Sequence, residues 1–194
     1  YVIGKTADIF GDKIFDNSRV HEAVNELDAD GQIADSSIDS LKSLIHAQAV
    51  APILDTAKAN YEDDMKLSDR KKLERTLRGQ SDYIVDRACT DFGIEQKTIE
   101  QERADALAAI PEDNKKKEAE TKINKEFDQK QQEVRKNFHE ALAASIDNLV
   151  NDAKKNVVER METSKIERQK DSMEDKVRDH LRGFSRTIPS FIMA

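Results

Sequence analysis

The sequence has no tryptophan, one cysteine and three prolines, and aromatic residues make up only 5% of its 194 positions. Because Cys89 stands alone, neither an internal disulfide nor a multi-cysteine zinc site can form, which fits a reducing compartment. We therefore expect a cytoplasmic protein. No apolar run approaches the roughly 20 residues of a membrane helix, and the first residues lack the basic and apolar regions of a secretion signal. No membrane partner is predicted.

Charged residues are abundant instead. They make up 37% of the chain, as much as the hydrophobic residues, and the net charge is −7. This balance favours elongated, solvated helices over a large globule. The negative charge disfavours a protein whose main task is to grip phosphate backbones, although it is compatible with a local basic strip.

Residues 112–182 contain neither glycine nor proline and are rich in Glu, Lys, Gln, Arg and Ala, which are strong helix formers. One straight helix of that length would extend roughly 105 Å at 1.5 Å per residue, far beyond a compact domain of this size. The segment therefore projects as an arm or folds back as a hairpin. Both outcomes suit an interaction scaffold better than a catalytic pocket.

The whole pattern predicts an all-α fold, in which a bundle of short helices precedes a long helical hairpin or coiled-coil-like arm. We divide the chain into an irregular N-terminal segment (1–17), the short-helix bundle (18–93), the hairpin or arm (94–184) and an apolar C-terminal tail (185–194). We expect the tail to be truncated from a larger protein.

Glycine and proline punctuate the predicted helices. Gly79 and Gly93 should each end one helix, and a bend or break is expected near Asp171, where the apolar pattern turns polar. Pro52 should start a new helix, and a kinked continuation is the alternative.

The strongest periodicity lies within the long segment, where apolar residues recur at spacings of 3, 4 or 7. It predicts a helix-pairing stripe, which resumes after a polar stretch at Met173 and Val177. Closure inside the chain and closure on a partner, including a second copy, both stay open. The candidate pairing residues are Phe127, Val134, Phe138, Leu142, Ile146 and Leu149.

Three basic clusters are candidates for contacts with DNA phosphates or with a partner. The alternative is ordinary solvated charge, balanced by acidic residues one helical turn away. The clusters are Arg70, Lys71 and Lys72; Lys115, Lys116 and Lys117; and Arg178, Arg182 and Arg186.

One small motif between two predicted helices mimics a calcium loop. Asp28, Asp30 and Gly31 occupy fitting positions, but Ser37 stands where a bidentate glutamate is needed, and Glu26 replaces the first aspartate. A helix-ending turn, stabilised by local hydrogen bonds of the aspartates, is the alternative.

The remaining motifs give no support to chemistry within this chain. Gly4-Lys5-Thr6 lacks the first glycine of a phosphate loop, and Asp91-Phe92-Gly93 lacks the companion motifs of a kinase. The four histidines show no metal-ligand spacing. We predict no catalytic residue, no metal and no cofactor in this chain.

The closing run Arg186-Thr-Ile-Pro-Ser-Phe-Ile-Met-Ala194, preceded by Arg182-Gly-Phe-Ser, resembles a stretch of the restriction (R) subunits of type I restriction-modification enzymes and of related helicase-like restriction proteins. The run Asp12-Lys-Ile-Phe-Asp-Asn17 is compatible with the same family. The resemblance covers a small part of the chain.

The resemblance implies a piece of a type I site-specific deoxyribonuclease, an ATP-driven DNA translocase that cooperates with modification and specificity subunits against foreign DNA. The nuclease carboxylates, phosphate loop and helicase motif of that family cannot be placed in this sequence. It therefore implies a helical accessory or docking region, with ATP, magnesium and the catalytic residues elsewhere in the parent. An unrelated coiled-coil adaptor is the alternative, and a calcium-responsive helical module is a third hypothesis.

Overall fold

A computed structural model describes residues 17–28, 32–61, 67–112 and 115–187. Every regular element among these residues is a helix, which confirms the predicted all-α fold. Most of the predicted N-terminal segment and of the apolar tail lies outside the described residues. The elements are α2 (Ser18–Glu26), α3 (Asp35–Ile45), the π-helical segment η1 (His46–Val50), α4 (Ala51–Tyr61), α5 (Leu67–Ala108) and α6 (Lys116–Thr187).

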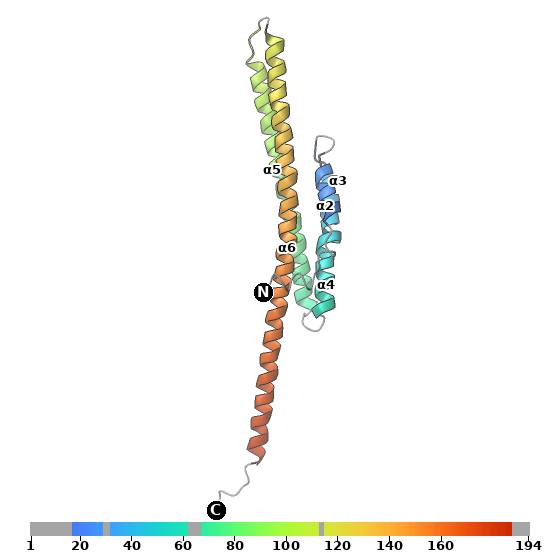
Figure 1. The fold of residues 1–194 in the computed structure, drawn as a ribbon, viewed down its shortest axis with the longest axis vertical. Helices are drawn as coiled ribbons and strands as arrows, with labels where there is room; N and C mark the ends of the chain where they lie inside the picture. Colours follow the sequence, from blue (N-terminus) through green and yellow to red (C-terminus); the bar gives the residue numbers. More distant parts are fainter. Residues whose placement is uncertain (1–16, 29–31, 62–66, 113–114, 188–194) are drawn as a thin grey trace, which may run out of the picture.

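Two long antiparallel helices, α5 and α6, form a hairpin that gives the molecule its rod shape (Figure 1). The short helices lie along the middle of the rod, where α2 contacts α3 and α6, α3 contacts α5, and α4 contacts α6. The hairpin tip projects beyond them at one end, and the last turns of α6 project alone at the other (Figure 1). The rod is therefore thickest where the short helices pack against the hairpin (Figure 1).

The core forms where the apolar faces of all these helices meet. Each fully buried Val, Leu, Ile, Phe or Met side chain stabilises the fold by about 1.5–3 kcal/mol relative to leaving it exposed. Side chains that are less than 2% exposed include Val20, Val24, Leu41, Ile45, Ile53, Val85, Leu142, Ile146 and Val157. Burial of these faces, more than helix propensity, fixes the short helices in place.

The helical path from Asp35 to Tyr61 accommodates a proline. Pro52 lies in the first turn of α4, but η1 joins α4 to α3 without a loop, so the helix continues through this region and the separate new helix predicted at Pro52 is wrong. A proline lacks the N–H of the helical pattern, and its ring crowds the carbonyl four residues earlier. The wider π-helical turn just before Pro52 is one of the recognised ways to relieve that conflict.

The structure corrects the predicted helix ends in α5. This helix has 42 residues and contains both Gly79 and Gly93, so the ends expected at these glycines are wrong, and the boundary expected between residues 93 and 94 falls inside one helix. Buried side chains lie on both sides of the glycines, including Leu77, Val85 and Ile99. Their burial outweighs the roughly 1 kcal/mol that each glycine costs a helix.

The expected break near Asp171 is also wrong, because α6 is a single helix of 72 residues. The polar residues around Asp171 are mostly strong helix formers, which favours a continuous helix through this stretch. Met161 is the last buried side chain of α6 among the described residues, and the described side chains of residues 166–180 are all exposed. Beyond Met161 the helix therefore leaves the core.

The predicted hairpin turns around Pro111, between the end of α5 and the start of α6. Polar contacts help to close the arm below this tip. Arg103 donates two hydrogen bonds to Asn124 Oδ1, of 2.6 and 2.9 Å, and its Nη1 lies 3.2 Å from Asp128 Oδ1. Lys130 on α6 forms an ion pair with Glu102 on α5.

Candidate interaction surface

Histidines on three elements join the short helices to the hairpin. His21 Nε2 on α2 lies 3.0 Å from Asp147 Oδ1 on α6, and His46 Nε2 in η1 lies 2.8 Å from Asp82 Oδ1 on α5. His139 on α6 makes the third such pair. Each pair has one imidazole and one carboxylate, and within the described residues no group of three or more His, Cys, Asp or Glu side chains is placed to hold a metal ion. We assign these pairs a structural role.

Asp28, at the end of the turn after α2, is 1% exposed and belongs to the third pair. His139 Nε2 lies 2.8 Å from its Oδ1, and Arg135 Nε lies 2.6 Å from its Oδ2 as an ion pair. Its carboxylate is thus turned into the bundle toward α6 instead of toward a calcium loop. Asp30 and Gly31, the other predicted loop positions, lie outside the described residues.

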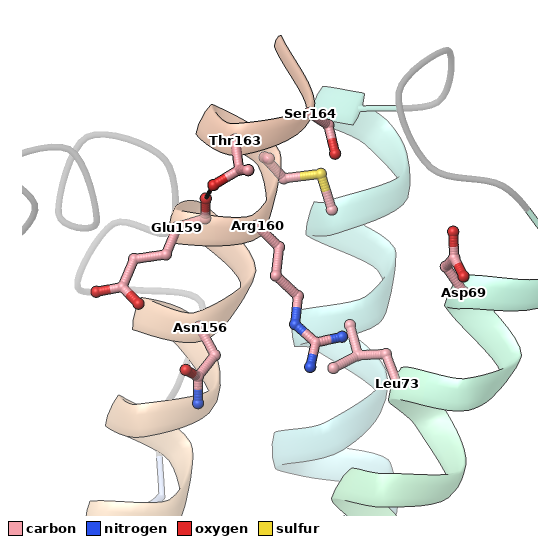
Figure 2. Close-up of a pocket in the computed structure, with 8 residues that line it drawn as sticks. Asp69, Leu73, Asn156, Glu159, Arg160, Thr163 and Ser164 are labelled. Atoms are coloured by element: carbon pink, nitrogen blue, oxygen red, sulfur yellow. Dashed lines mark hydrogen bonds between the residues drawn. The ribbon is translucent and has the colours of Figure 1, made fainter. Parts of the chain in front are cut away.

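A cleft of about 520 Å3 lies between the start of α5 and α6, and Figure 2 shows the residues that line it. Its polar groups do not converge on one point. The Arg160 side chain extends toward Leu73, and the Thr163 hydroxyl donates a 3.0 Å hydrogen bond back to the Glu159 carbonyl (Figure 2). Asp69 lies on the opposite side of the cleft from the Glu159 carboxylate (Figure 2). The residues drawn there do not form the close nucleophile and base pair that catalysis requires.

The only cysteine is held in an unreactive state. Cys89 lies in the core, and burial is the main reason that the pKa of its thiol rises to about 11. Nearby, Lys42 Nζ on α3 lies 2.5 Å from Asp86 Oδ1 on α5, and this hydrogen bond raises the pKa of Lys42. A thiol with a raised pKa is a poor nucleophile at neutral pH.

The predicted helix-pairing residues are all at least half-buried, and Val134 packs against the core. Phe138, Leu142 and Ile146 are buried in the core, and the Phe138 ring stacks on Phe92 of α5 with centroids 4.3 Å apart. Phe127, Val134 and Leu149 are half-buried. Phe92 belongs to the kinase-like motif, and its stacking shows that this residue packs between α5 and α6.

The predicted basic clusters are not brought together. The first lies at the start of α5, the second at the hairpin tip, and Arg178 near the far end of α6 (Figure 1). Lys116 Nζ lies 2.6 Å from Glu112 Oε1, and Arg178 Nη1 lies 3.8 Å from Asp175 Oδ1, which are local pairs of the kind expected for solvated charge. The side chains of Arg182 and Arg186 lie outside what the structure describes.

Two apolar surfaces are not covered by other residues that the structure describes. The first, which we name the distal stripe, consists of Ile166, Met173 and Val177 on the part of α6 beyond the core; these side chains are 64%, 67% and 57% exposed. The second, which we name the open groove, is a hollow of about 550 Å3 between α5 and α6. Its lining includes Tyr83, Ile84, Ala88, Phe92, Val134, Phe138 and Ala141.

Sequence reasoning found half of these surfaces. The pattern predicted that the apolar face resumes at Met173 and Val177, but it did not separate the uncovered residues from the packed ones. The open groove was missed, because Tyr83 and Ile84 carry the same helical spacing as neighbours that face the core. Only the position of the short helices decides which face of α5 stays open.

Among the described residues, no helix combines the length and the apolar character needed to cross a membrane. Comparisons of this chain with models of protein families, with curated proteins and with solved structures find no match.

Proposed function

We propose that this chain is a non-catalytic helical docking element, which holds a partner polypeptide through the distal stripe. The observation that carries the proposal is the exposure of Ile166, Met173 and Val177 on one face of a helix that has left its own core. These side chains line one hollow together with Gln169 and Lys170, and exposed apolar patches on a surface mark interaction sites.

The energetics favour a covered stripe. A single helix without tertiary contacts is marginal in water, because most helix stability in proteins comes from packing of an apolar face. With the three side chains more than half exposed, burying them would contribute roughly 3–5 kcal/mol from the usual value for each residue type. That gain is large compared with the stability of a solvated helix end.

The setting that we propose is the motor (R) subunit of a restriction enzyme, on the strength of the C-terminal run that begins at Arg186. ATP-dependent translocation and cleavage of foreign DNA then reside in other parts of the subunit. In this setting the docking element contacts the modification and specificity subunits.

We propose that each basic cluster contacts DNA on its own, because the clusters lie far apart. At 1.5 Å per residue, Lys116 and Arg178 are roughly 90 Å apart along α6. Each cluster would contribute sequence-independent phosphate contacts, which weaken as salt is added.

A coiled-coil adaptor unrelated to restriction is the second candidate, because the same uncovered stripe favours it. The two candidates differ in the identity of the partner. Sedimentation velocity of the full chain, alone and mixed with the modification and specificity subunits, separates them.

The test compares Met173→Glu with Ser172→Glu. Both variants add one negative charge at neighbouring exposed positions, but only Met173 lies on the stripe. We expect the wild-type chain and Ser172→Glu to form larger complexes and Met173→Glu to lose them. If Met173→Glu and Ser172→Glu form complexes of the same size and amount, docking through the stripe is contradicted. A wild-type chain that stays monomeric in every mixture contradicts it as well. Complexes that never include the two subunits favour the adaptor.

A further inference from the structure

We draw no further inference here: the strongest candidate, the distal stripe on α6 together with the open groove between α5 and α6, is an apolar surface that the described residues leave unpartnered, and nothing in the structure shows what covers it.

Discussion

His139 Nε2 lies 2.8 Å from Asp28 Oδ1, and this carboxylate is only 1% exposed. Asp28 follows α2, whereas His139 and its neighbour Arg135 lie one turn apart on α6. A buried carboxylate therefore ties the short helices to the hairpin. Charges taken out of water are costly unless their partners stay in place.

Removing the partners should cost more than removing the carboxylate. Arg135→Met combined with His139→Leu leaves Asp28 buried and unpaired, and we expect the free energy of unfolding to fall by about 3–5 kcal/mol. Asp28→Ala should cost only about 1–2 kcal/mol, because the Arg135 side chain is 42% exposed and can turn to water. Urea unfolding followed by circular dichroism measures both losses.

Arg178→Ala is the matched control for this comparison. Arg178 belongs to an exposed pair with Asp175, so its loss should change stability by less than about 0.5 kcal/mol. A larger loss for Asp28→Ala than for the double variant contradicts the assignment of Asp28 as a buried charge that depends on α6.

The stacked rings of Phe92 and Phe138 should be coupled energetically. Phe138→Ala leaves a cavity in the core and should lower the free energy of unfolding by about 3–5 kcal/mol. A double-mutant cycle with Phe92→Ala should give a coupling of about 0.5–1.5 kcal/mol, as for other aromatic pairs. Phe127→Ala, at a half-buried position on the arm, is the control and should cost less. Additive losses at the two stacked positions contradict the coupling.

The two glycines of α5 should be replaceable with a gain in stability. A Cβ atom added at Gly79 or Gly93 meets nothing within 4 Å. Both residues lie inside a helix, where alanine is favoured over glycine by about 1 kcal/mol. Gly79→Ala and Gly93→Ala should therefore each raise the free energy of unfolding by up to that amount, measured by thermal and urea unfolding. Ala104→Gly, at an exposed position of the same helix, should lower it.

Ionisation of the Cys89 thiol should lower the stability of the fold at alkaline pH. Burial raises the pKa of its thiol from 9.0 to about 11, so above pH 9 the unfolded chain releases this proton before the folded chain does. The unfolded state then binds fewer protons, and stability falls as the pH rises toward 11. Unfolding measured across this window should show a smaller fall for Cys89→Ala than for the wild-type chain.

A thiol reagent gives an independent check on Cys89. At neutral pH the folded chain should react slowly, and urea should restore the rate of an exposed thiol. Fast reaction in the folded state would contradict the buried, protonated thiol.

Helix content was predictable because it depends on local sequence. Residues 116–182 of the run without glycine or proline lie in α6, and Pro111 lies in the hairpin turn. The helix ends expected at Gly79 and Gly93 were wrong because tertiary burial overrode a local penalty. No local signal exists for that outcome, since the compensating contacts come from other helices.

The candidate site was less accessible to sequence reasoning. Asp28 looked like a turn or calcium residue because its partners, Arg135 and His139, are distant in the chain. Val150 is buried but was passed over in favour of Leu149, which is half-buried. A shift of one residue turns a helical position by about 100°, and only the position of the other helices decides which of two adjacent apolar residues faces inward.

The continuous helix α6 runs from the hairpin tip to the far end of the described rod. Its length sets the distance between any two bodies attached to it. The 72 residues of α6 measure about 108 Å at 1.5 Å per residue. Bodies attached at the hairpin tip and near Val177 are held at a set spacing and a set relative rotation. Deleting one residue between them would shorten that spacing by about 1.5 Å and turn one body by about 100° against the other, so distance and orientation are locked together.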